Sequence, residues 1–114
     1  MSVQYPQLPD LDEDDLQFLN QLNQDDEKIR FVTLMNIADE EREELLPWLH
    51  YALNHDPASI VREEAAKRLE GWEDKETLIA LANALTDASE DVVAAATQSL
   101  SEVKYTESAE ILAP

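Results

Sequence analysis

His50 and His55 are the two histidines of the chain, and they are the first residues to consider for metal binding or acid–base chemistry. A zinc site needs several such ligands that converge on one point. Five residues correspond to about 500° of rotation along a helix, so the two rings do not share a face. We therefore expect both histidines to be ordinary surface or turn residues, and we predict no metal site.

Acidic residues are abundant enough to form adjacent pairs, for example Glu40 with Glu41 and Glu63 with Glu64. General acid–base catalysis needs a cleft that shifts the pKa of one carboxyl of such a pair. The sequence indicates no such cleft. In a chain this acidic, adjacent carboxylates arise by chance, and we interpret them as solvated surface.

The segment that starts at Asp10 has the alternating acids of a calcium-binding loop over its first residues. Such a loop requires Gly at its sixth position and Glu at its twelfth, where this chain has Asp15 and Gln21. An acidic helix start is the better interpretation. With no Cys and one Gly, the chain also lacks a thiol nucleophile and a phosphate-binding loop. We predict no catalytic residue, no cofactor and no enzyme activity.

The composition points to one helical domain. The chain has 114 residues, of which 44% are hydrophobic, so a core can form. Asp and Glu number 26 against 8 Lys and Arg, giving a formal net charge of −18 that repels the phosphates of nucleic acid and anionic membranes. No apolar run approaches membrane length. We expect a cytoplasmic protein whose partner is another protein, with a basic partner favoured by charge and a homodimer left open.

Helix start and stop signals divide the chain. Acids crowd a first helical turn from residue 12, where negative charge suits the helix dipole. Asp56 before Pro57 is typical of a helix start, and Gly71 of a helix end. A third helix is expected to begin near Asp39, with Pro47 either kinking it or delaying its start. The predicted organisation is an extended leader at 1–11, a helical repeat domain at 12–104, and a tail at 105–114 that could form a short capping helix.

Apolar residues recur with a period of 31 to 32 residues. Asp25, Asp56 and Asp87 stand 31 residues apart, and each precedes a helix with inner-face residues at i, i+4 and i+8. In these helices the corresponding positions are Ile29, Val61 and Val92; Thr33, Ala65 and Ala96; and Ile37, Leu69 and Leu100. In the helices that precede them, the corresponding positions are Phe18, Leu49 and Leu81, and then Leu22, Leu53 and Leu85. A period of this size predicts stacked helix pairs, each burying its apolar face against the next.

The segment from Asp56 to Ala66 resembles the second-helix signature of HEAT repeats. It is especially similar to the short bacterial type that is also found in phycobilisome bilin lyases. Residues 87–100 are similar to a second, looser copy, and residues 25–37 to a third. The resemblance implies an all-α fold, a right-handed α-solenoid of about three helix pairs, used mainly as a scaffold for binding proteins.

The resemblance also implies a ladder between repeats, formed by a turn Asp and a helix Arg six residues later. Only Asp56 and Arg62 keep both members. Phe31 and Val93 stand six residues after the corresponding Asp of the other two copies. We therefore expect an incomplete ladder.

The outward side of the second helices is the usual recognition surface of the family. Positions two, six and nine residues after Val61, and two and six residues after Val92, lie on that side. Trp72 follows Gly71 and could anchor a partner. The predicted partner-binding residues are therefore Glu63, Lys67, Glu70, Trp72, Ala94 and Gln98. The same steps in the first repeat give Phe31, Met35 and Ala38. We interpret Phe31 and Met35 as packing under Tyr5 and Leu8 of the leader, and Ala94 as packing under the tail; the alternative is a cap formed by a partner or a second copy.

Three functional hypotheses follow. The leading one is a non-catalytic protein-interaction module, an adaptor or regulatory subunit, that binds a protein on its second repeat helices. The alternative is an acidic mimic of nucleic acid that occupies the basic site of a nucleic-acid-binding protein, which requires acids gathered on one face. The third, suggested by the bilin lyase resemblance, is an accessory subunit of a lyase-like enzyme.

Overall fold

The computed structural model describes residues 3–103, which form six α-helices, two short 3₁₀ helices and no strand. In chain order the elements are α1 (Glu13–Leu22), α2 (Glu27–Asp39), η1 (Glu43–Leu45), α3 (Leu46–His55), α4 (Ser59–Arg68), α5 (Lys75–Asn83), η2 (Ala84–Thr86) and α6 (Glu90–Ser101). The predicted all-helical class is confirmed. The predicted tail at 105–114 lies outside the described residues.

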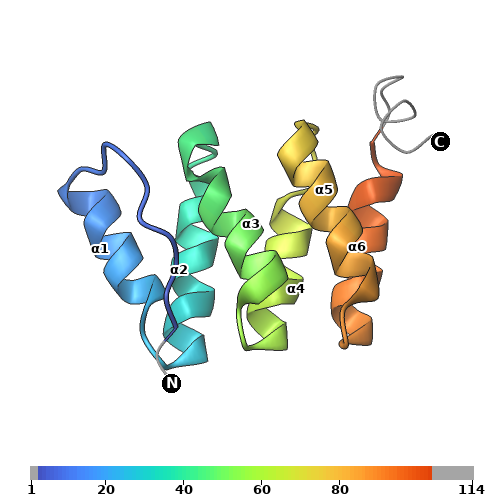
Figure 1. The fold of residues 1–114 in the computed structure, drawn as a ribbon, viewed down its shortest axis with the longest axis horizontal. Coiled ribbons are helices and arrows are strands. Elements are labelled where there is room, and N and C mark those ends of the chain that lie inside the picture. Colours follow the sequence, from blue (N-terminus) through green and yellow to red (C-terminus); the bar gives the residue numbers. More distant parts are fainter. Residues whose placement is uncertain (1–2, 104–114) are drawn as a thin grey trace.

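The helices form three pairs that stand side by side as an α-solenoid (Figure 1). Within the pairs, α1 packs against α2, α3 against α4, and α5 against α6. Between the pairs, α4 contacts both α2 and α6, and α3 contacts α5. The first helices of the pairs thus make one layer and the second helices make the other, as stacking of a helical repeat requires.

Polar caps fix where several helices begin. At the start of α1, the Asp12 carboxylate accepts a hydrogen bond of 2.8 Å from the Asp15 N–H. At the start of α5, the Asp74 carboxylate accepts one of 3.1 Å from the Thr77 N–H. Such caps satisfy N–H groups that a first helical turn leaves without partners. After α4, Gly71 has a φ of +93°, which favours glycine and ends the helix where the sequence predicts.

The boundary between α2 and α3 differs from the prediction. The third helix does not begin near Asp39, because α2 continues to that residue and α3 starts at Leu46. Glu41 has a φ of +51°, which takes the chain out of the right-handed helical path. Pro47 then stands in the first turn of α3, where its missing N–H leaves no helical hydrogen bond unmade. Pro47 therefore marks a late start rather than a kink.

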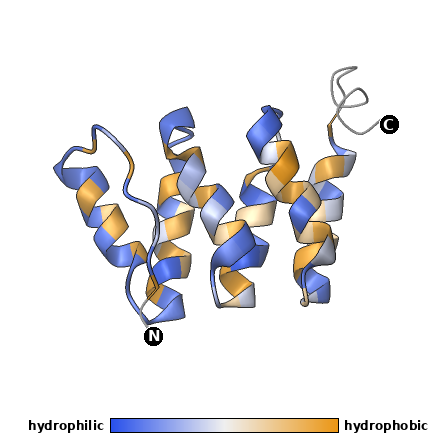
Figure 2. Cartoon of the chain, viewed as in Figure 1, coloured by the Kyte–Doolittle hydropathy of each residue, from blue (hydrophilic) through white to orange (hydrophobic). Residues whose placement is uncertain are grey.

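The core lies between the two layers of helices. Trp48 is fully buried there. The other large apolar side chains that are almost completely buried are Leu22, Leu34, Ile37, Leu45, Leu53, Val61, Leu69, Leu81 and Val92. Figure 2 shows hydrophobic residues along the helices and hydrophilic residues at most of the turns that join them. Burial of these side chains is the main driving force for the stack.

Two predicted core residues are exposed instead: the side chains of Ile29 and Leu85 each have 41% exposure. Val61 and Val92 correspond to Ile29 and are fully buried, because another helix pair precedes each of their repeats. Within residues 3–103 no pair precedes α1 and α2, so Ile29 lacks that cover. At Leu85 the chain tightens into η2, and Ala84 takes the buried position.

The leader runs without helical structure between α1 and α3 (Figure 1). Tyr5 is only 5% exposed, and its N–H donates to Asn23 Oδ1 at the end of α1 (2.7 Å). The indole N–H of Trp48 on α3 donates to the carbonyl of Pro6 (2.8 Å). Because α1 and α3 make little direct contact, the leader fills the place where these two helices would otherwise pack. It therefore closes the first-helix layer.

Candidate functional site

A ladder of ion pairs joins the three repeats. Arg30 on α2 donates to both carboxylate oxygens of Asp56, at 2.9 and 3.0 Å. Arg62 on α4 donates to both oxygens of Asp87, at 2.9 and 3.2 Å. In each pair, the Arg of one repeat binds the Asp that precedes the second helix of the next repeat. Two-point contacts of this kind fix orientation as well as distance, so they set how α2, α4 and α6 stack.

The expectation of an incomplete ladder is wrong, because the alignment of Asp25 with Asp56 places the first repeat one residue out of register with the second. The second helices have equivalent cap residues, which are Asp26, Ala58 and Ser89. Two residues before these caps stand Gln24, Asp56 and Asp87; four residues after them stand Arg30, Arg62 and Val93. Gln24, and not Asp25, is therefore the counterpart of Asp56. Every junction between neighbouring repeats has its Arg–Asp pair.

The pKa shifts of two ladder residues, Asp87 and Arg30, favour their charged forms. Burial alone would raise the pKa of Asp87, but the hydrogen bonds from Arg62 and from the Ser89 N–H lower it overall. The hydrogen bonds to Asp56 raise the pKa of Arg30 further above its ordinary value. These charges face each other inside the stack, so their role is structural.

A groove of about 270 Å³ lies between α4 and α6. Its lining residues are Glu63, Lys67, Glu70, Asp91, Ala94, Ala95, Gln98 and Ser99. The structure thus brings five of the six predicted partner-binding residues into one groove. Trp72, the sixth, does not line it; that side chain is partly buried and packs against the core.

Asp91, Ala95 and Ser99 line the groove but were not predicted. The counted steps followed the same side of both helices, whereas the groove is formed by facing sides of α4 and α6. Ala95 and Ser99 are buried positions on the side of α6 that turns toward α4. Positions three and seven residues after Val92 would have given them from the helical period alone.

Three of the six polar side chains that line the groove, those of Glu63, Lys67 and Ser99, already have partners within the chain. The Lys67 ammonium lies 3.1 Å from the Glu63 carboxylate, and this hydrogen bond raises the pKa of Lys67. The Ser99 hydroxyl donates to the carbonyl of Ala66 (2.7 Å). The alanines between these groups form a floor of small side chains. The groove can therefore receive protruding side chains, but it has no assembled set of reacting groups.

The repeat period, the layered helix pairs and the Arg–Asp ladder agree with a comparison of the sequence with family models. Residues 16–101 match the model for HEAT repeats. The chain belongs to the HEAT-repeat family. No curated protein and no solved structure matches it. HEAT repeats generally mediate protein–protein interaction. The narrower resemblance to the repeats of bilin lyases stays a prediction.

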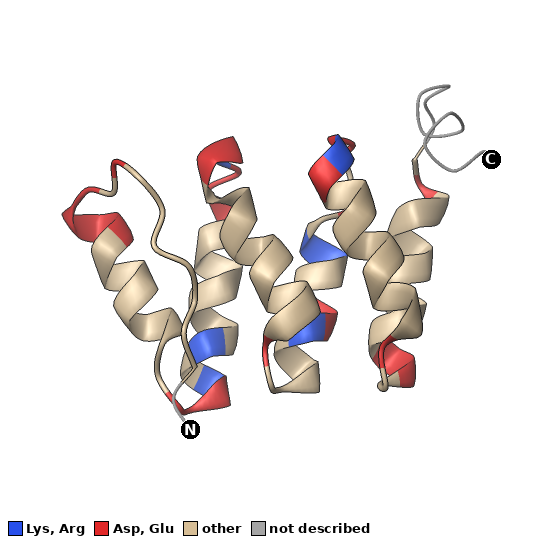
Figure 3. Ribbon diagram, in the orientation of Figure 1, with Lys and Arg blue, Asp and Glu red and all other residues tan. Residues whose placement is uncertain are grey.

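Many acidic residues of this HEAT stack lie at one end of its helices and others at the opposite end, as the red ribbon in Figure 3 shows. The acidic rim, as we name it, comprises the start of α1, the turns between successive pairs and the end of α6: Asp10, Asp12, Glu13, Asp14, Asp39, Glu40, Glu41, Glu43, Glu44, Glu70, Glu73, Asp74, Glu76 and Glu102. Several of these lie at the C-terminal ends of helices, where the helix dipole disfavours negative charge. Local helix stability explains the acids at the starts of helices, such as the caps Asp12 and Asp74, but not those at the ends.

Arginines partly neutralise the acidic rim. Arg42 donates to both oxygens of the buried Asp15, at 2.8 and 3.0 Å, and these bonds hold the pKa of that carboxyl below its ordinary value. Arg42 also contacts Glu40 at 3.1 Å. Arg68 at the end of α4 reaches Asp39 at the end of α2 (2.7 Å). The other acids of the rim outnumber these cations, so the rim remains negative.

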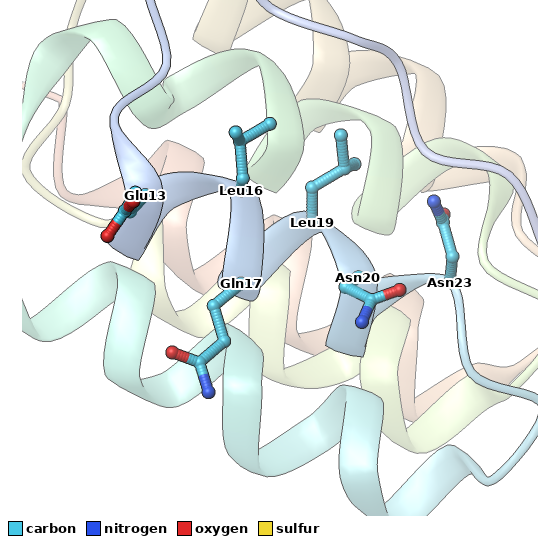
Figure 4. A pocket seen from close by; sticks show the side chains of 6 residues that line it. All are labelled: Glu13, Leu16, Gln17, Leu19, Asn20 and Asn23. Atoms are coloured by element: carbon cyan, nitrogen blue, oxygen red, sulfur yellow. The ribbon is translucent and has the colours of Figure 1, made fainter.

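A second, shallower hollow lies on α1 and is lined by Glu13, Leu16, Gln17, Leu19, Asn20 and Asn23 (Figure 4). Leu16 and Leu19 project from one side of the helix, while Gln17 points to the other side. Leu16 is 46% exposed. The sequence did not single out this surface. All of its lining residues come from one element, so it offers a partner a flatter surface than the groove between two helices.

His50 is not an ordinary surface residue. It is half-buried, and its Nε2 lies 2.7 Å from the hydroxyl oxygen of Thr77. That hydroxyl donates to the Asp74 carboxylate (2.8 Å), so the imidazole must donate to it. Burial lowers the pKa of His50. Thr77 is completely buried and cannot reach a substrate, so this set ties α3 to the start of α5.

His55 is exposed at the end of α3, and its ring lies 5.0 Å from that of Tyr51. Between residues 3 and 103, no three His, Asp or Glu side chains converge as a metal site requires. The helices of that region are also too short or too polar to cross a membrane.

Proposed function

We propose that this protein is a non-catalytic protein-interaction module, and that its partner binds in the groove between α4 and α6. The observation that carries this proposal is the groove itself, which gathers Glu63, Lys67, Glu70, Ala94 and Gln98. Membership of the HEAT-repeat family supports a protein as the ligand. The strongly acidic composition favours a partner that carries basic charge.

The construction of the groove suits this role. Its two walls come from neighbouring repeats that the Arg62–Asp87 pair locks together, so the site is rigid before a partner arrives. Ala94 is exposed on α6, and Ala95 below it is 8% exposed. Small residues leave room for a partner's side chains to enter, and the charged residues on the walls can define orientation.

A groove-filling substitution tests the proposal. Ala94→Trp places a large side chain where the partner should lie, whereas Thr97→Trp adds the same side chain at an exposed position of α6 outside the groove. Proteins captured from a lysate by the wild type, Ala94→Trp and Thr97→Trp forms are compared by mass spectrometry. We expect one protein to be retained by the wild type and Thr97→Trp and lost with Ala94→Trp. Equal retention by all three would reject the groove.

The acidic rim favours a second candidate function, the mimicry of nucleic-acid charge. Its acids gather on one end of the stack, in part against the helix dipoles. Of the acids at other places, Glu63 and Glu64 lie on α4, and Glu90 and Asp91 lie at the opposite end of the stack. A mimic would therefore use the rim alone.

Salt dependence separates the two candidates. Binding through the rim should weaken steeply between low and moderate ionic strength, because exposed charges are screened within about 10 Å at 0.1 M salt. It should also weaken in a variant with Glu40, Glu43 and Glu44 changed to Gln, and remain unchanged in Ala94→Trp. Retention of the partner at high salt together with loss in Ala94→Trp would favour the groove.

A further inference from the structure

The groove between α4 and α6 has at each of its ends a carboxylate that makes no hydrogen bond or close ion pair within residues 3–103. Glu70 follows the last turn of α4, and Asp91 lies in the first turn of α6. Neither side chain makes a hydrogen bond or an ion pair with any part of the chain from residue 3 to residue 103. Glu63, the third acid of the lining, is engaged by Lys67. Lys67 also interacts electrostatically with Asp91, but three carboxylates and one ammonium line the groove, so its net charge is negative.

The distance between these two carboxylates follows from the repeat geometry. Because Ala58 and Ser89 are equivalent caps, Asp91 stands at the height of Ile60 on the neighbouring helix. Glu70 is ten residues beyond Ile60 along α4. At 1.5 Å per residue, the two carboxylates are therefore separated by about 15 Å along the groove. α4 and α6 lie side by side and run in the same direction, so this separation is measured parallel to both (Figure 1).

The floor between the two charges is shallow and made of small residues. Ala94 and Ala95 lie there, and the Ser99 hydroxyl is already bonded to the carbonyl of Ala66. A ligand that follows the groove therefore meets apolar contacts in the middle and negative charge at both ends. A helix whose contacting face has apolar side chains in the middle and cations on either side matches this arrangement.

We propose that the groove binds a helical segment of a protein partner with two basic residues eleven positions apart. Eleven residues make about three helical turns, so both basic residues lie on one face and about 16 Å apart, which matches Glu70 and Asp91. This proposal rests on the proposed function and adds the chemistry and spacing of the partner. A spacing of nine residues gives two and a half turns, which turns one cation away from the groove.

Two synthetic peptides test this spacing. Both are alanine-based helices of the same composition and net charge, with two arginines at i and i+11 in one and at i and i+9 in the other. Their binding to the full chain is measured by fluorescence anisotropy at low salt. We expect the i+11 peptide to bind about tenfold more tightly. Equal affinities, or no detectable binding of either peptide, would overturn the proposal.

Single substitutions locate the bound peptide. Glu70→Gln and Asp91→Asn should each weaken the i+11 peptide about three- to tenfold and leave the i+9 peptide less affected. Glu43→Gln removes an equal charge from the acidic rim and should change nothing. If Glu43→Gln weakens binding as much as the other two, the attraction is to net charge and the proposal is wrong.

Ala94→Trp separates failure of this proposal from failure of the proposed function. The substitution should abolish binding of the i+11 peptide and of a captured protein partner alike. If Ala94→Trp abolishes binding of the protein partner while the two peptides bind the wild type equally, the groove binds a protein without selecting basic residues eleven positions apart. If it removes neither, the groove is not the binding site and both proposals are rejected.

Discussion

The carboxylate of Asp56 is shared by the Arg30 guanidinium and the Tyr5 hydroxyl. Arg30 donates to both oxygens at 2.9 and 3.0 Å, and the Tyr5 hydroxyl donates to Oδ2 at 2.6 Å. The Ala58 N–H donates to Oδ1 (2.9 Å). The side chain of Asp56 is completely inaccessible to solvent. One buried carboxylate thus joins the first repeat, the second repeat and the leader.

Loss of Arg30 should destabilise the protein more than loss of Arg62. The Arg30–Asp56 side chains are 3% and 0% exposed, whereas those of Arg62 and Asp87 are 16% and 11% exposed. Removing one member of a fully buried pair leaves a desolvated charge, at a cost of about 3–5 kcal/mol. We expect Arg30→Ala to cost about that much and Arg62→Ala about 1–3 kcal/mol. Urea unfolding measures the free energy of unfolding of both variants. Equal decreases would show that the deeper burial of the Arg30–Asp56 pair does not make it the more important of the two.

Tyr5→Phe tests whether the leader is part of the folded unit. The change removes one hydrogen bond to Asp56 but keeps the ring that lies 4.7 Å from Tyr51. A hydrogen bond to a charged group is worth about 1.5–3 kcal/mol, and the loss should be near the lower value because Arg30 still satisfies the carboxylate. Tyr51→Phe is the matched control, since no hydrogen bond of the Tyr51 hydroxyl is involved in this contact. A shift in urea midpoint for Tyr5→Phe no larger than that for Tyr51→Phe would show that the leader contributes little.

Gly71→Ala should lower the free energy of unfolding, whereas Glu41→Gly should raise it. Gly71 has a φ of +93°, so Gly71→Ala introduces strain of about 1–2 kcal/mol even though no atom lies within 4 Å of the new Cβ. Glu41 has a φ of +51° with a side chain present, so Glu41→Gly should relieve strain and stabilise by up to about 1 kcal/mol. Thermal unfolding of the two variants checks the signs. A stabilised Gly71→Ala form would refute the role of φ.

Stability should fall on mild acidification because of His50. Its pKa is lowered by burial in the folded state, so the neutral form is favoured there. Above the ordinary pKa of about 6.5 both states are neutral and the contribution is complete. As the pH falls below that value, the unfolded chain binds the proton first, and the free energy of unfolding decreases until the folded pKa is passed.

His50→Gln isolates this effect. Glutamine can still donate to the Thr77 hydroxyl but does not titrate. The variant should lose the decrease in stability between about pH 7 and pH 5 that the wild type shows. Negative charge on Asp74 and Glu76 opposes the shift, so the wild-type decrease should be larger at high salt. The same pH slope in both proteins would assign the decrease to other groups.

The helices could be predicted where the sequence contains a local signal. Asp12 caps α1 and Gly71 ends the turn after α4, because both act through their own backbone neighbours. The end of α2 could not be read in this way. The helix ends because Glu41 adopts a left-handed backbone conformation, which is uncommon for a residue other than glycine and is not indicated by the sequence. The buried set was also predicted well, except at Ile29 and Leu85. The exposure of Ile29 depends on its being in the first repeat, and that of Leu85 on the tightening of the chain into η2.

The ladder and the groove show two different limits of sequence analysis. A spacing of 31 residues selected Asp25 as the counterpart of Asp56 and so missed Arg30 as a ladder residue. The cap positions in the structure show that Gln24 is the counterpart instead. In the groove, helical steps found Glu63, Lys67 and Ala94 but not Asp91, because the facing side of α6 is set by how the repeats pack.

The ladder of ion pairs has an uncharged residue at each of its two ends. Gln24 stands where an Arg from a preceding repeat would need a carboxylate, and Val93 stands where a following Asp would need a guanidinium. A further repeat or a second copy placed against either end would therefore lack the two-point ion pair that orients neighbouring repeats within this stack. Its orientation would have to be set by other contacts.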